Sequence, residues 1–90
     1  PPPPRVWADK HPAAAARLDY ARNAIAALSV ELSVPVENMM TPDTVRRVMW
    51  QPPAEGESLH EILADYAARE WQIELLSPVL EAAIEAGAGI

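Results

Sequence analysis

Apolar residues recur every three or four positions along most of the chain, the spacing that places them on one face of a helix. The first such series consists of Leu18, Ala21, Ile25, Leu28 and Leu32. Pro12 suits the first position of this helix. Pro35 ends it, because the residue before a proline is disfavoured in the helical region. The pattern therefore predicts that the longest helix lies between these two prolines.

A second helix is predicted from Pro42 to the Pro52-Pro53 pair. Thr41 suits the N-cap position, and Asp43 lies in the first turn, where the helix dipole favours negative charge. Val45, Val48 and Met49 share one face, whereas Arg46 and Arg47 point mostly to the other. A single helical turn is expected just before it, over residues 36–40.

Two further helices are predicted near the end of the chain. Ser58 and Glu61 have the spacing of a capping box, which begins a short helix. The last helix covers residues 70–86, with its apolar positions at Trp71, Leu75, Leu76, Val79, Leu80, Ala83 and Ile84. Because these positions keep one phase across Pro78, we expect one kinked helix, and the alternative is two helices with Ser77 as the second cap.

No segment alternates polar and apolar residues as a strand does, so the sequence predicts an all-α fold of four or five short helices around one core. Residues 1–11 are rich in proline and are expected to form an extended linker arm from an upstream domain, with Trp7 anchoring its end. A docking peptide for a proline-binding partner is the alternative. Residues 12–90 form the helical domain.

The overall charge is acidic, with thirteen acidic and seven basic residues and a net charge of −6. Such a domain repels phosphate on average, so any nucleic-acid contact must be local and weak. Apolar runs are too short to cross a bilayer, and no secretory signal is recognised. The absence of cysteine fits a reducing compartment, so we expect a cytoplasmic piece of a longer protein that contacts no membrane.

The residues that carry chemistry are few. His11 and His60 lack the spacing that sets two imidazoles on one metal ion. Glu55, Glu57 and Glu61 are interpreted as a solvated surface beside a loop. No glycine-rich phosphate cradle and no Ser-His-Asp set is present. The prediction is that this chain alone is not an enzyme and holds neither a metal nor another cofactor.

Aromatic and basic residues leave one functional hypothesis open. Trp50 and Trp71 are interpreted as core residues, with base stacking as the alternative. Arg46 and Arg47, together with Arg69, are the candidate nucleic-acid-binding residues; Arg17 or Arg22 could add to the patch. The other interpretation is that Arg46 and Arg47 are ordinary surface charges paired with acidic neighbours such as Asp43.

The order of segments resembles a known family. "ARLDYARNAIAALSVEL", "VPVENMMTPDTVRRVMWQPP" and "REWQIELLSPVLEAAI" are similar to the HRDC-like helical domain that follows the exonuclease core of ribonuclease D-type proteins. The resemblance implies a 3'-5' exonuclease domain upstream in the same chain, with divalent metal ions. For this piece it implies an accessory role in guiding the 3' end of RNA or single-stranded DNA. The alternative is a protein-interaction module that packs on the catalytic domain.

Overall fold

The computed structural model describes all 90 residues and contains helices but no strand. A 3-10 turn, η1 (Pro4–Val6), leads into α1 (Trp7–Lys10), α2 (Pro12–Leu32), α3 (Val36–Met39), α4 (Pro42–Trp50), α5 (Leu59–Asp65) and α6 (Glu70–Gly87). The predicted all-α fold is confirmed. The predicted bounds of the later helices are also close to those observed, whereas η1 and α1 were not foreseen.

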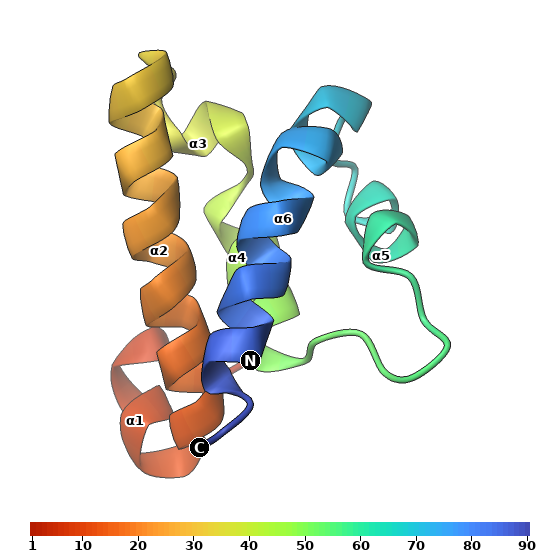
Figure 1. The fold of residues 1–90 in the computed structure, drawn as a ribbon. Coiled ribbons are helices and arrows are strands. Elements are labelled where there is room, and N and C mark those ends of the chain that lie inside the picture. The colour runs from red at the N-terminus through yellow and green to blue at the C-terminus, as the bar shows by residue number, and fades with distance from the viewer.

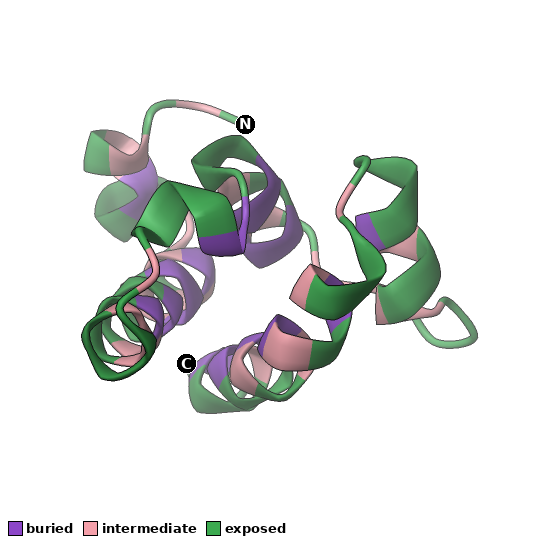
Figure 2. Ribbon diagram, turned by 90° about the horizontal axis from the view of Figure 1, so that it is seen from above, coloured by how far each residue is buried: buried purple, intermediate pink, exposed green.

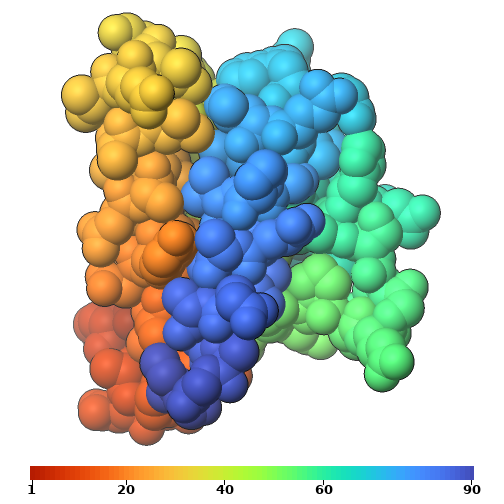
Figure 3. Space-filling view, viewed as in Figure 1, coloured from red at the N-terminus to blue at the C-terminus, as the bar shows by residue number.

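The long helices α2 and α6 lie side by side, and α4 packs behind them (Figure 1). α5 stands to one side at the end of the loop that follows α4, and it packs mainly on α6. In the space-filling view, α2 and α6 together form most of one face of the molecule (Figure 3). No helix, including the 21-residue α2, has the apolar length that a bilayer crossing requires.

One apolar core holds the helices together, and the buried residues line the inward faces of α2, α4 and α6 (Figure 2). The core consists of Trp7, Ala14, Leu18, Ala21, Ile25, Met39, Met40, Val45, Val48, Met49, Leu63, Ile73, Leu76, Leu80 and Ala83. Only Leu63 in this set comes from α5. α5 therefore contributes one fully buried side chain, with Leu59 and Ile62 partly buried against the core.

The N-terminal segment differs from the predicted extended arm, because residues 4–10 are helical. The burial of Trp7 gives the physical reason. Its indole is completely buried, lies 4.9 Å from the ring of Trp50 and donates from Nε1 to the carbonyl oxygen of Pro2 at 2.8 Å. These contacts turn the chain back on itself and outweigh the preference of consecutive prolines for an extended path. The predicted anchoring by Trp7 is confirmed.

α6 is one continuous helix through Pro78, so the alternative of two helices is wrong. Its buried row is Ile73, Leu76, Leu80, Ala83 and Gly87. At the start of α5, the backbone N–H of Glu61 donates to Oγ of Ser58 at 3.2 Å, as the capping-box spacing predicts. α5 therefore begins at the predicted cap, and α6 passes through Pro78 without a break.

Candidate nucleic-acid interface

α4 presents the two predicted arginines to solvent. Val45, Val48 and Met49 bury one face of this helix, which turns Arg46 and Arg47 outward. Their side chains are 33% and 49% exposed. The amphipathic pattern of α4 therefore places both guanidinium groups on the surface, as expected from the sequence.

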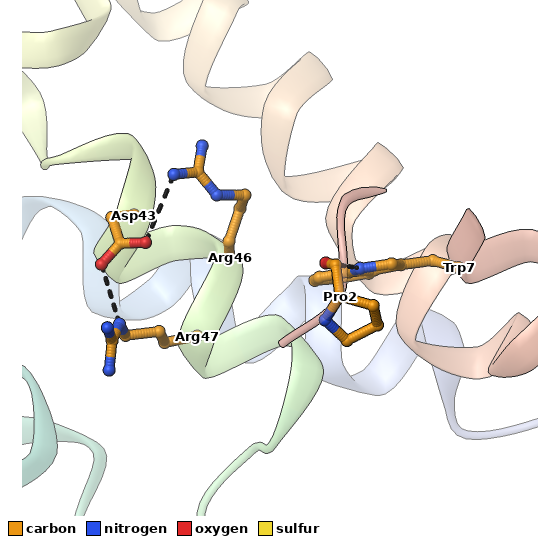
Figure 4. Close-up of polar contacts among 5 residues, drawn as sticks. All are labelled: Pro2, Trp7, Asp43, Arg46 and Arg47. Carbon is orange, nitrogen blue, oxygen red and sulfur yellow. Dashed lines mark hydrogen bonds and ion pairs between the residues drawn. The ribbon is translucent and has the colours of Figure 1, made fainter. Parts of the chain in front are cut away.

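Asp43 holds both arginines at once (Figure 4). Its Oδ1 accepts from Arg46 Nη2 at 3.3 Å, and its Oδ2 accepts from Arg47 Nε at 2.8 Å. The hydrogen bond from Arg47 is the largest cause that lowers the pKa of Asp43 below its usual value. Two positive charges and one negative charge leave a single net positive charge here. The structure shows the pairing with Asp43 on which the alternative interpretation of these arginines as ordinary surface charges depends, and such exposed ion pairs contribute little to stability.

Arg47 also contacts an aromatic ring. Its guanidinium carbon lies 5.7 Å from the centroid of Tyr66, within the range of a cation–π interaction. The hydrogen bond to Asp43 is the largest cause that raises the pKa of Arg47 above its ordinary value, and Tyr66 acts in the same direction. Arg47 therefore stays charged and links α4 to the end of α5.

Beside Arg47 lies a cleft of about 390 Å³, here called the α4–α5 cleft. It is lined by Pro1, Arg47, Trp50, Gln51, Pro52, Glu57, Ile62 and Tyr66. α4 and the loop after it form one wall, α5 forms another, and the N-terminal segment closes the end. The lining combines one guanidinium group, one carboxylate and two aromatic rings, and its volume falls within the range of small-molecule sites.

Arg69 is not joined to Arg46 or Arg47 by any contact. It precedes α6, where its backbone N–H donates to Oε1 of Gln72 at 2.7 Å, and Nε2 of Gln72 donates to the carbonyl oxygen of Asn38 at 2.9 Å. The guanidinium of Arg69 forms no ion pair, and its residue is exposed. Its role in a shared basic patch stays a prediction.

Arg17 has a structural setting that sequence analysis missed. It is only 8% exposed, and its Nε donates to the carbonyl oxygen of Met49 at 2.7 Å. Nη2 donates to the carbonyl oxygen of Trp50 at 3.4 Å. Burial lowers the pKa of Arg17, because desolvation disfavours the charged form. Arg17 therefore binds the carbonyl end of α4 and has little surface for phosphate, whereas Arg22 is exposed.

The three tryptophans occupy three different settings. Trp7 is buried, Trp50 is half-buried against the core and Trp71 is 48% exposed. The prediction of a core position is therefore wrong for Trp71, because the first turn of α6 buries Ile73 in its place. The observed row keeps Leu76, Leu80 and Ala83 of the predicted one but begins at Ile73, so the indole of Trp71 faces solvent.

Charge is divided unequally between the two parts of the chain. Residues 1–53 carry six basic and five acidic side chains, whereas residues 54–90 carry one basic and eight acidic side chains. The part that includes α2 and α4 is thus near neutral, and the part with α5 and α6 is strongly acidic. A polyanion would approach the α2–α4 side with less repulsion.

Histidines and carboxylates do not gather into a metal-binding group of three or more. His60 Nε2 lies 3.1 Å from Oε2 of Glu70, and both side chains are more than half exposed. The interpretation of His60 as a surface residue is confirmed.

Comparisons with known proteins give one family and one structure. The family described as "3' to 5' exonuclease C-terminal domain" matches residues 1–84. A crystal structure of a protein from Bifidobacterium adolescentis superposes with a TM-score of 0.80 and 27% sequence identity, over 94% of this chain and 20% of that one. This chain therefore spans about a fifth of that protein's length. No curated protein matches it. The predicted resemblance to an exonuclease's C-terminal helical domain is confirmed.

Proposed function

This chain belongs to the family of 3' to 5' exonuclease C-terminal domains, and we propose that it is a non-catalytic, HRDC-like accessory domain of a ribonuclease D-type enzyme. In this role it helps to bind and position RNA near its 3' end. The observation that carries the proposal is the family match, which spans residues 1–84.

The distribution of charge supports a particular orientation in this role. The α2–α4 side carries Arg22, Arg46 and Arg47 in the near-neutral part of the chain, whereas the acidic side chains are concentrated after residue 53. Phosphate is repelled least at the α2–α4 side. In the proposed arrangement this side faces the nucleic acid.

The parent enzyme supplies the chemistry. Its catalytic domain lies upstream in the same chain and binds divalent metal ions, while this domain needs no cofactor of its own. The first residues lead from that domain, and Trp7 fixes their end to the core. The proposed location of the enzyme is the cytoplasm.

The test is the double variant Arg46→Ala, Arg47→Ala in the parent protein. Loss of two phosphate contacts is expected to weaken RNA binding and to reduce the slope of log affinity against log salt by about 1.4, because each single-strand contact contributes about 0.7. Filter binding across a salt series measures both quantities. An unchanged slope would remove these two arginines from the proposal.

The second candidate is a protein-interaction module that never touches nucleic acid. The acidic α5–α6 part and the half-exposed Trp71 favour it. Anisotropy titrations with labelled RNA at low salt distinguish the two functions. No RNA binding by this chain, together with measurable association with the catalytic domain, would select the interaction module.

A further inference from the structure

We propose that the α4–α5 cleft binds one unpaired ribonucleotide of an RNA strand and that Glu57 makes it prefer RNA to DNA. The base stacks on Tyr66, a phosphate binds Arg47, and the ribose 2'-hydroxyl donates a hydrogen bond to Glu57. This inference rests on the proposed function and places an RNA nucleotide at the edge of the α2–α4 side, where Arg47 meets Glu57 and Tyr66 of the acidic part.

Tyr66 provides the surface for the base. Its residue is 42% exposed and borders the cleft, although large apolar side chains elsewhere on α5, such as Leu63, are buried. Each nucleobase has a flat π face, so an exposed ring beside a cleft stacks on it with little dependence on sequence. The guanidinium carbon of Arg47 lies over one face of this ring, 5.7 Å from its centroid, so the base is proposed to stack on the opposite face.

Arg47 provides the positive charge. Its Nε donates to Oδ2 of Asp43, and Tyr66 also acts on its guanidinium, so a phosphate is proposed to bind at the remaining N–H groups. Asp43 fixes the plane of the guanidinium and favours its charged form. Arg47 is therefore a positioned hydrogen-bond donor to a phosphate at the edge of the cleft.

Glu57 provides an acceptor that suits a hydroxyl group. Its Oε1 accepts from the backbone N–H of Ala54 at 2.7 Å, and its own N–H donates to the carbonyl oxygen of Ala54 at 2.9 Å. Gly56, with a φ of +86°, makes this tight turn possible. Oε2 has no partner in the chain. A carboxylate repels phosphate, but it accepts readily from a hydroxyl, and the 2'-hydroxyl is the donor that DNA lacks.

Arg47 and Glu57 line the same cleft without forming an ion pair. A ligand that carries both an anion and a hydroxyl donor therefore fits between them. An internal nucleotide of RNA has both groups, together with a base for Tyr66. The nucleotide bound here lies upstream of the 3' end, which the catalytic domain must hold.

The experiment uses the 90-residue chain and three hexanucleotides of one sequence: RNA, DNA and 2'-O-methyl RNA. NMR titration at low salt is expected to shift the amide signals of residues 47–66 with RNA. DNA and 2'-O-methyl RNA are expected to bind about tenfold more weakly, as the loss of one hydrogen bond to a charged group predicts. Equal affinities for all three strands would overturn the preference for RNA.

Single variants separate the three contacts. Glu57→Gln is expected to lower affinity for RNA without lowering affinity for DNA. Tyr66→Leu is expected to weaken both strands about tenfold, and Tyr66→Phe to restore binding, because only the ring is needed. Thermal melts of each variant report whether the fold is intact. Binding unchanged in a folded Tyr66→Leu variant would contradict the stacking.

Arg46 offers a matched control for Arg47. Both residues pair with Asp43, yet only Arg47 lines the cleft. Arg47→Gln is expected to weaken RNA binding at least fivefold more than Arg46→Gln. Equal losses would overturn the cleft while leaving the accessory function standing. The absence of any RNA binding, with no effect of the double variant in the parent protein, would overturn both proposals.

Discussion

Two interfaces of this fold differ in how far their polar groups are buried. One is the interface between α2 and α6 around Arg17 and Gly87, here called the seam, and the other is the interface at which α5 packs on α6. At the seam, the buried Arg17 binds two backbone carbonyl oxygens of α4 and packs against Gly87. At α5, the polar contacts are the exposed pairs His60–Glu70 and Arg47–Tyr66. Buried hydrogen bonds to a charged group contribute more than exposed ion pairs. Stability is therefore expected to be concentrated at the seam.

The same difference has a functional side. α5 forms one wall of the α4–α5 cleft and has only Leu63 among the core residues. Elements with few buried contacts open locally at lower free energy than the rest of a protein. The wall that we expect to contact a ligand is therefore the wall that adjusts most easily.

The largest expected change in stability comes from truncating two equally buried leucines, one in α6 and one in α5. Leu76 of α6 and Leu63 of α5 are both fully buried. Leu76→Ala is expected to lower the free energy of unfolding by about 3–5 kcal/mol, and Leu63→Ala by about 2–3 kcal/mol. Urea unfolding measures both values. Hydrogen exchange is expected to show that Leu63→Ala opens α5 first, and uniform loss of protection across all helices would contradict the comparison.

Removal of Arg17 tests the polar part of the seam. Arg17→Ala is expected to cost about 2–3 kcal/mol, because it removes charged hydrogen bonds from two helix-end carbonyl groups as well as the packed stem of the side chain. Arg22→Ala, an exposed position on the same helix, is expected to stay within about 0.5 kcal/mol. Urea midpoints provide the measurement. Similar losses of unfolding free energy at both positions would contradict the stabilising role of the buried hydrogen bonds of Arg17.

Gly87 tests how closely the two helices must approach. A Cβ at this position would lie 2.6 Å from Cγ of Arg17 and 2.9 Å from the carbonyl oxygen of Ala13. Gly87→Ala is therefore expected to destabilise the fold by about 1–2 kcal/mol, because the backbone oxygen of Ala13 cannot move aside as the end of a side chain can. Gly89, whose added Cβ would meet nothing within 4 Å, is the control. A melting temperature that falls equally for Gly89→Ala would argue against the close approach.

The smallest effect on stability is expected from lowering the pH, which protonates Asp43 in its exposed ion pairs with Arg46 and Arg47. The pKa of Asp43 is lowered in the folded state, mainly by Arg47, relative to an unfolded value of about 3.9. The small stabilisation from this group is thus present above that value and is lost as pH falls through the folded pKa. NMR titration of the Asp43 carboxyl group provides the measurement. A folded pKa at or above the unfolded value would contradict the pairing.

Local sequence was enough to predict most helices but not every buried face. Prolines and caps mark both ends of α2 and α4 and the start of α5 closely. α6 has apolar residues on so much of its surface that two overlapping rows are available, and only packing against α2 selects the row through Ile73. The wrong prediction for Trp71 follows from that ambiguity.

Long-range contacts explain what the sequence could not reveal at the surface and at the seam. The environment of Arg17 depends on carbonyl groups 32 and 33 residues further along the chain. The α4–α5 cleft likewise joins α4 to Tyr66 through tertiary packing, although the exposure of Arg46 and Arg47 followed from the helix pattern alone. Residue spacing reports which side of a helix is polar, but it does not report what that side meets.

The different surroundings of the three indole rings give this chain its own optical reporters. Trp7 and Trp50 lie close enough for their electronic transitions to couple, which adds a near-ultraviolet circular dichroism signal that depends on the folded N-terminal segment. Trp71 is accessible to a dissolved quencher such as acrylamide, whereas Trp7 is shielded. The circular dichroism of the Trp7–Trp50 pair thus reports on the N-terminal segment, and the quenching of Trp71 fluorescence reports on the start of α6, without any attached dye.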